Sequence, residues 1–107
     1  MVEASDPAFD ALLRAARVDF ANGLSVRVDE IEQSAARGAW VEARRAAHKL
    51  RGAAAVYGFG ALGAASGELE DLLASCECEP DAHARELVDQ ALHRLRTLAE
   101  AAPAEAR

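Results

Sequence analysis

Apolar residues return at intervals of three and four along most of the chain, with polar residues between them. An α-helix turns once in about 3.6 residues, so this spacing places the apolar side chains on one helical face. We therefore expect five amphipathic helices. Their apolar stripes are Phe9, Leu12, Leu13, Ala16 and Phe20; Leu24, Val28, Ile31 and Ala35; Trp40, Ala43, Ala47, Leu50, Ala54 and Tyr57; Leu62, Ala65, Leu69, Leu72 and Leu73; and Leu87, Val88, Ala91, Leu95 and Leu98.

Residues that begin or end helices lie between these stripes. Asp6-Pro7 predicts the start of the first helix, because aspartate caps free amides and proline suits the first helical position. Asp81 is placed to cap the last helix in the same way. Gly38 is expected to end the second helix in the left-handed conformation, and Gly58 and Gly60 to break the third.

These elements predict an all-α fold, an antiparallel four-helix bundle with an additional short N-terminal helix. The first two helices are joined so briefly, near Asn22-Gly23, that we expect them to pack antiparallel. The helical core should run from about residue 6 to residue 100, and the tail AAPAEAR should be loose. A chain of 107 residues is long enough for a single domain.

Composition and charge narrow the functions that fit this bundle. The 18 acidic residues exceed the 12 Lys and Arg residues, which argues against a nucleic-acid surface. No apolar run approaches the roughly 20 residues of a membrane span, and the N-terminus has no signal-peptide pattern. Cys76 and Cys78 are too close for an easy disulfide and fit a reducing compartment. We expect a cytoplasmic protein.

His48 is the most promising reactive residue. At about 100° per residue it lies roughly 130° from the centre of the apolar stripe of its helix, so it should face solvent. Residues three and four positions away are its surface neighbours, and these include Arg44, Arg45, Arg51 and Gly52. A histidine in water has a pKa of about 6.5, so its ring is mostly neutral at cellular pH and can attack phosphorus. The alternative is an ordinary exposed histidine among solvated arginines.

The stretch His48-Lys49-Leu50-Arg51-Gly52-Ala53-Ala54, followed by Gly58, Leu62 and Leu69-Glu70, resembles the signature of histidine-containing phosphotransfer (HPt) domains. These helical bundles relay phosphoryl groups between aspartates of response-regulator receiver domains in bacterial multistep two-component phosphorelays. The resemblance implies that His48 accepts the phosphoryl group. It further implies that Arg51 takes the place of the usual lysine and that Gly52 allows a partner to approach.

The chain also departs from the family pattern. Arg51 presents a planar fork instead of a compact ammonium, so its contact to phosphate should differ. Ala55 and Val56 are more apolar than usual, which we attribute to the surface of the partner, and Tyr57 is expected to serve packing. We assign partner binding to a basic and apolar surface around the histidine, made of Arg44, Arg45, Lys49, Ala55 and Val56.

The resemblance implies partners and cofactors as well. Receiver domains and a hybrid histidine kinase are the expected partners, with Mg²⁺ on the receiver. The chain should need no cofactor of its own, and it lacks a nucleotide-binding motif, so we expect a monomeric phosphocarrier that does not use ATP.

Two other functions compete with this prediction. One is a non-catalytic adaptor that keeps the bundle and binds a receiver or kinase without carrying phosphate. The other is a metal-binding bundle using Cys76, Cys78 and His83, although a structural zinc site normally has four ligands.

The remaining polar and small-residue clusters have simpler explanations. His83 and His93 are expected on the surface. Gly60, Gly63 and Gly67 are better explained by close helix packing than by phosphate binding, since no strand precedes them. Finally, we interpret the run of Glu68, Glu70 and Asp71 as a solvated helix face.

Overall fold

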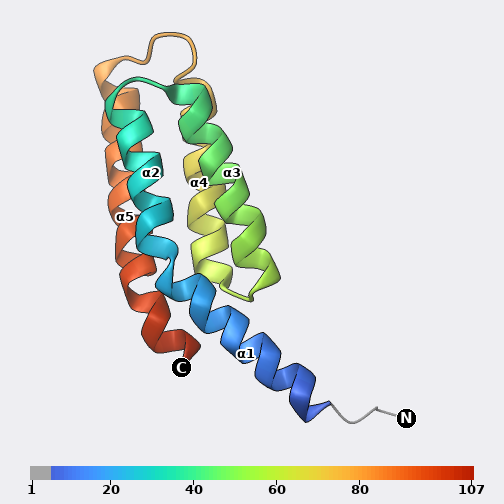
Figure 1. Ribbon diagram of the computed structural model, residues 1–107. Helices are drawn as coiled ribbons and strands as arrows, with labels where there is room; N and C mark the ends of the chain where they lie inside the picture. Colours follow the sequence, from blue (N-terminus) through green and yellow to red (C-terminus); the bar gives the residue numbers. More distant parts are fainter. Residues whose placement is uncertain (1–5) are drawn as a thin grey trace.

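The computed structural model describes residues 6–107 and contains helices but no strand in that range (Figure 1). The helices are α1 (Pro7–Asn22), α2 (Leu24–Ala36), α3 (Trp40–Val56), α4 (Gly60–Ser75) and α5 (Ala82–Ala106). Helices α2 to α5 run alternately up and down, and each contacts its two neighbours in the order α2, α3, α4, α5 and back to α2. The all-α four-helix bundle predicted from the sequence is confirmed. None of the helices described is long and apolar enough to cross a membrane.

The predicted caps at Asp6 and Asp81 and the predicted left-handed turn at Gly38 are confirmed, and Gly58 follows the end of α3, whereas Gly60 is the first residue of α4. The carboxylate of Asp6 accepts a hydrogen bond from the Ala8 amide at 3.0 Å, and that of Asp81 accepts one from the Ala84 amide at 2.8 Å. Gly38 and Gly58 follow α2 and α3 with φ of 74° and 78°. Glycine adopts this left-handed conformation without the steric penalty of a Cβ, so both chain reversals are short.

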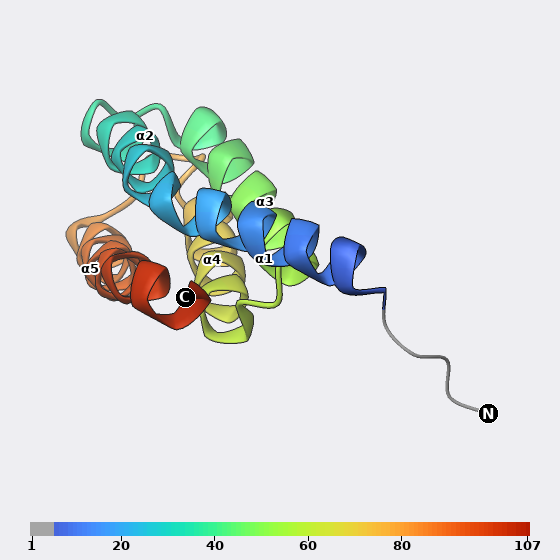
Figure 2. The same cartoon turned by 60° about the horizontal axis from the view of Figure 1, so that its bottom comes forward.

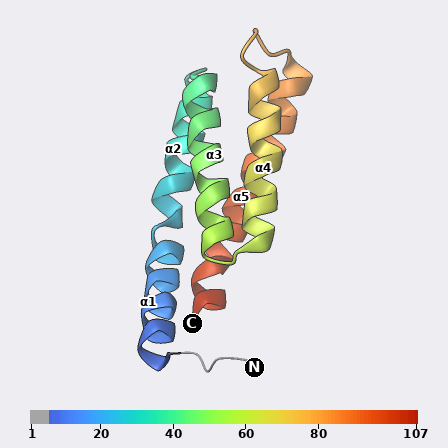
Figure 3. The same cartoon turned by 90° about the vertical axis from the view of Figure 1, so that its right-hand side faces the viewer.

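The junction between α1 and α2 differs from the prediction. Gly23 has φ −88° and ψ −4°, close to helical values, and its amide donates to the carbonyl oxygens of Asp19 and Phe20 at 3.1 Å. Because helical hydrogen bonding nearly continues through Gly23, the chain does not reverse, and α2 continues the course of α1 (Figure 3). The expected antiparallel pairing of these two helices is wrong. The N-terminal helix is also 16 residues long, against 13 for α2.

The two halves of α1 have different environments. Phe20 is buried and stacks on Tyr57 with ring centroids 4.8 Å apart. Phe9, Leu12 and Leu13 are 56%, 69% and 49% exposed, because the first half of α1 extends past the end of the bundle (Figure 2). The apolar stripe predicted for this helix is therefore only partly a core face.

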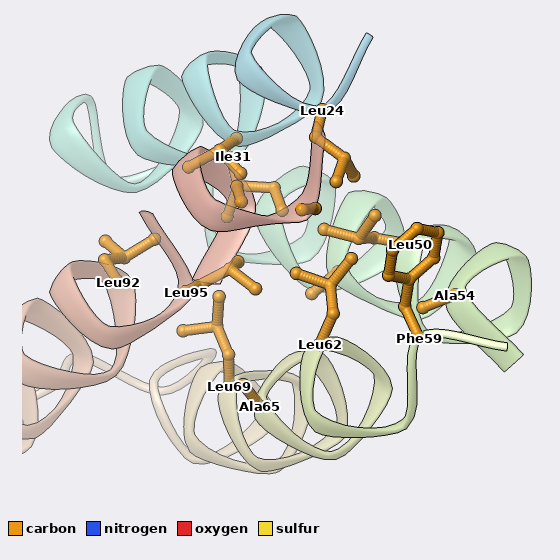
Figure 4. Close-up of a cluster of buried hydrophobic side chains, with 14 of the residues drawn as sticks. Leu24, Ile31, Leu50, Ala54, Phe59, Leu62, Ala65, Leu69, Leu92 and Leu95 are labelled. Carbon is orange, nitrogen blue, oxygen red and sulfur yellow. The ribbon is translucent and has the colours of Figure 1, made fainter. Parts of the chain in front are cut away.

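Leucines from the four bundle helices form the core, and several of them converge in Figure 4. The fully buried large side chains include Leu24 and Ile31 of α2, Leu50 of α3, Leu69 and Leu73 of α4, and Leu95 of α5. Burying each such side chain contributes about 1.5–3 kcal/mol, so this layer holds α3 and α4 in register. On α5, Leu92 is buried as well, Ala91 and Leu98 pack against the core, and Leu87 is partly buried.

The C-terminal segment is helical, so the expectation of a loose tail is wrong. Helix α5 continues to Ala106 through Pro103. Ala99, Ala102 and Ala106 extend the buried stripe of α5 at intervals of three and four, and all three are buried. Pro103 removes one amide donor, yet it lies in the last turn, where few further hydrogen bonds depend on it. The small alanine side chains of this segment allow close contact between α5 and α1.

Candidate functional site

His48 lies on the outer face of α3, as predicted. Its side chain is 70% exposed, whereas Ala47 and Leu50, its neighbours on the inner face, are buried. The helical rotation that buries those two residues turns the imidazole toward solvent on the side of α4. A large partner can therefore reach the ring without any rearrangement of the core.

Glu70 of α4 binds His48 and Arg51 together. One carboxylate oxygen, Oε2, lies 2.9 Å from His48 Nδ1, and the other, Oε1, lies 3.4 Å from Arg51 Nη1. The Glu70 side chain is only 16% exposed, although it belongs to the acidic run that we interpreted as a solvated face. That interpretation is wrong for Glu70. It holds for Glu68 and Asp71, which are exposed.

The pairing with Glu70 makes the two ring nitrogens of His48 different. A carboxylate only accepts hydrogen bonds, so the contact places the proton of the neutral ring on Nδ1. In the part of the chain that the structure describes, this is the one hydrogen bond that the ring makes. Nε2 then carries the lone pair of the neutral ring, on a side chain that is 70% exposed.

Gly52 leaves the surface next to His48 open. A Cβ built at Gly52 would meet no non-local heavy atom of the described residues within 4 Å. Because Gly52 lies one turn from His48 on the same face of α3, the partner-facing side of the imidazole is bordered by bare backbone. The site therefore combines an exposed imidazole, a neighbouring guanidinium and an open surface, an arrangement that suits the transfer of a charged group between proteins.

A comparison with protein-family models matches the Hpt domain over residues 10–104. The chain belongs to the Hpt domain family. Hpt domains carry phosphoryl groups on a histidine in phosphorelays and interact with response-regulator receivers and kinases of two-component systems. Neither curated proteins nor solved structures gave a significant match.

The arginines of this Hpt domain are less available than the sequence suggested. Arg44 is half-buried and forms an ion pair with Glu77, in the loop after α4. Arg51 is 56% exposed and engages Glu70 through a single long contact. Of the three guanidinium groups expected around His48, Arg44 and Arg51 already have carboxylate partners.

The other residues assigned to partner binding lie on both sides of His48. Arg45 and Lys49 border a small pocket of about 220 Å³ toward α2, away from Glu70. Ala55 and Val56 are exposed in the last turn of α3, and Val56, at 79%, is the most exposed large apolar residue in the range 6–107. A partner that covers all of them would contact most of the outer face of α3.

The remaining candidate residues are apart from this site. His83 and His93 are on the surface of α5, as predicted. Cys76 is buried and Cys78 is exposed, and burial raises the pKa of the Cys76 thiol. Within residues 6–107, no three His, Cys, Asp or Glu side chains are arranged to hold a metal ion. Cys76, Cys78 and His83 therefore do not form a cluster.

The glycines of α4 partly fit the packing explanation. A Cβ at Gly63 would lie 3.7 Å from the Ala54 Cβ, and one at Gly67 would lie 3.2 Å from Arg51 Nε, so both face α3 closely. Gly60 has no such neighbour within 4 Å among the described residues. Sequence reasoning proposed His48, Arg51 and Gly52 as site residues and did not include Glu70, which the structure places in contact with His48 and Arg51.

Proposed function

We propose that His48 takes a phosphoryl group from the aspartyl phosphate of a response-regulator receiver domain and passes it to the aspartate of another receiver. The observation that supports this proposal is the contact between Glu70 Oε2 and His48 Nδ1 at 2.9 Å, which leaves the lone pair of the neutral, 70% exposed ring on Nε2. An exposed histidine of no function would not need a partly buried carboxylate to orient it.

The transfer would proceed by direct displacement at phosphorus. The Nε2 lone pair forms a bond to phosphorus while the bond from phosphorus to the aspartyl oxygen breaks, and the aspartate leaves as a carboxylate with that electron pair. Nδ1 keeps its proton, so the ring gains positive charge as the new bond forms. The Glu70 carboxylate, already hydrogen bonded to Nδ1, would stabilise that charge without reorganisation.

Arg51 would act on the phosphoryl oxygens. Its guanidinium is exposed, shares Glu70 with His48 and lies one turn after the histidine on the same face. A charge-assisted hydrogen bond from arginine to a phosphoryl oxygen is stronger than a neutral one, and it would help to compensate the negative charge that arrives with the group. Arg44 could contribute only after it releases Glu77.

The partner would supply the rest of the chemistry. A receiver domain would bring Mg²⁺ and its acidic pocket, while this chain would supply the imidazole, the arginine and a surface for docking. We propose that the chain works as a monomeric cytoplasmic carrier with no cofactor of its own and without ATP, and that a hybrid histidine kinase is the source of the phosphoryl group.

Incubation with phosphorylated receiver domains tests this function. We expect the chain to take up labelled phosphate in a form that acid hydrolyses and base leaves intact, as is expected for phosphohistidine. The label should return to an unphosphorylated receiver when one is added. A chain that binds the receiver but stays unlabelled would be an adaptor, and the proposal would be wrong.

A further inference from the structure

Gly67 of α4 lies directly beneath the side chain of Arg51. A Cβ at this position would lie 3.2 Å from Arg51 Nε, 3.3 Å from Cδ and 3.4 Å from Cζ. These distances are shorter than ordinary contacts to a Cβ, so the guanidinium rests against helix backbone that only glycine leaves uncovered. Gly67 itself is buried, and the arginine forms part of its cover.

The position of Arg51 over Gly67 sets where its charge lies relative to His48. From this position Nη1 reaches Glu70 Oε1 at 3.4 Å, while the other oxygen of the same carboxylate holds His48 Nδ1. Gly67 and Glu70 are three residues apart and share one face of α4. A Cβ at position 67 would displace the guanidinium from α4 by a few tenths of an ångström and so change its distance from a phosphoryl group that His48 would carry.

We infer that Gly67 is a positioning residue for Arg51, and that it acts by the absence of its side chain. The inference rests on the proposed phosphotransfer at His48 and adds a residue of α4 to the site. Helix propensity does not explain a glycine here, because alanine is the better helix former in the interior of a helix. Glycine at this position lowers helix stability but leaves room for the guanidinium to lie against the backbone of α4.

Gly63 is a matched control on the same helix. It lies one turn before Gly67 and also faces α3, but a Cβ there would meet the Ala54 Cβ at 3.7 Å and the Arg51 carbonyl oxygen at 3.8 Å. Both are ordinary contacts, and neither involves the arginine side chain. Replacing either glycine by alanine favours the helix equally, so a difference between the two variants reports on Arg51.

The experiment measures transfer from a phosphorylated receiver to the parent chain and to four variants, namely Gly67→Ala, Gly63→Ala, Arg51→Ala and the double variant Gly67→Ala/Arg51→Ala. We expect Gly67→Ala to slow transfer roughly three- to tenfold, because small misplacements of a charged group are costly. Gly63→Ala should match the parent. In the Arg51→Ala background, Gly67→Ala should have no further effect, because the group that it displaces is gone.

The NMR signal of the Arg51 Nε–Hε group gives a readout that needs no phosphate. It should shift in Gly67→Ala and stay in place in Gly63→Ala. Transfer by Gly67→Ala at the parent rate, an equal slowing in both backgrounds, or an unmoved Arg51 signal would overturn the inference. If the parent takes up no label, the proposed function fails instead, and the NMR comparison alone decides the role of Gly67.

Discussion

Among the arginine–carboxylate contacts between helices of this Hpt domain, those of Arg96 and Arg51 are built differently. On one side of the bundle, Arg96 of α5 binds Asp29 and Glu32 of α2. On the other side, Arg51 of α3 binds Glu70 of α4. The Arg96 side chain is 23% exposed and that of Arg51 is 56% exposed.

The Arg96 cluster is saturated. The guanidinium donates to Glu32 from Nε at 2.9 Å and also from Nη2, and the same Nη2 donates to Asp29 at 2.5 Å. Desolvation lowers the pKa of Arg96, but hydrogen bonds to the two carboxylates and their charges outweigh it, so the net pKa lies above its usual value. A raised pKa on a base adds stability at every pH below its ordinary value, so this contribution should be constant over the working range.

The Arg51 cluster is open. Arg51 makes one long contact to Glu70, and the other oxygen of that carboxylate is used to orient His48. An arginine with most of its donors unused can turn to an incoming anion at little cost, whereas Arg96 would have to give up two carboxylates. Arg51 therefore keeps unused hydrogen-bond donors beside the exposed ring of His48, whereas Arg96 spends its donors on holding α2 and α5 together.

The largest effect should come from removing the reactive atom of the open cluster. We expect His48→Gln to fold like the parent and to take up no phosphate, because the side chain is exposed and glutamine has no nucleophilic ring nitrogen. Thermal melting and phosphate uptake measure the two effects. His93→Gln is the control, since His93 is an exposed histidine of α5 and should keep full uptake. Label that remains on His48→Gln would remove His48 from the mechanism.

Replacing Glu70 should have the next largest effect. We expect Glu70→Ala to slow phosphate uptake, because the ring loses the acceptor that orients it and stabilises its positive charge. A hydrogen bond to a charged group contributes about 1.5–3 kcal/mol, which corresponds to roughly ten- to a hundredfold in rate. Glu70→Gln should lie between parent and Glu70→Ala, because the amide oxygen still accepts from Nδ1 but carries no charge. Equal rates for Gln and Ala would show that charge alone matters.

Much of the structure of this molecule could be predicted from its sequence. The features that could not be predicted depend on more than the rotation of residues within one helix. Periodicity predicted the bundle helices and the outward direction of His48, because both depend on rotation within one helix. The exposure of Phe9 and the burial of Ala106 depend on which other element reaches each residue, and the direction of α2 depends on the near-helical conformation of Gly23. A stripe of apolar or small residues carries no information about that.

Glu70 was missed for the same reason. It lies 22 residues from His48 in the chain, between two acidic neighbours, and is one of three residues in the run that look alike. Only the antiparallel packing of α3 on α4 separates it from Glu68, which faces Arg94 of α5 at 2.9 Å. The position of Glu70 three residues after Gly67 could have indicated that it faces α3, because the two residues share one face of α4.

Breaking the saturated cluster should affect stability and leave function intact. We expect Arg96→Ala to lower the free energy of unfolding by about 1–2 kcal/mol, since two carboxylates lose a shared partner at a partly buried position. The rate of phosphate uptake should not change. Arg94→Ala is the matched control: its bridge to Glu68 is 59% exposed on both sides, and its loss should cost about 0.5 kcal/mol or less. Denaturant unfolding compares them, and equal losses would contradict the distinction between the clusters.

The smallest effect is expected at Gly52, which keeps the open cluster accessible. Glycine inside a helix is about 0.5–1 kcal/mol less stable than alanine, and a Cβ here would meet no non-local atom within 4 Å in the described chain, so Gly52→Ala should be slightly stabilising. Gly58→Ala is the control: its Cβ would meet equally open space, but its φ of 78° should make that variant less stable.

Gly52→Gln should fold normally yet bind the receiver more weakly and transfer more slowly, because its side chain fills the space one turn from His48. Melting curves and transfer rates measure both effects. Parent-like transfer by Gly52→Gln would show that the partner approaches Nε2 from the side of α4 and Arg51 and does not need the open surface at Gly52.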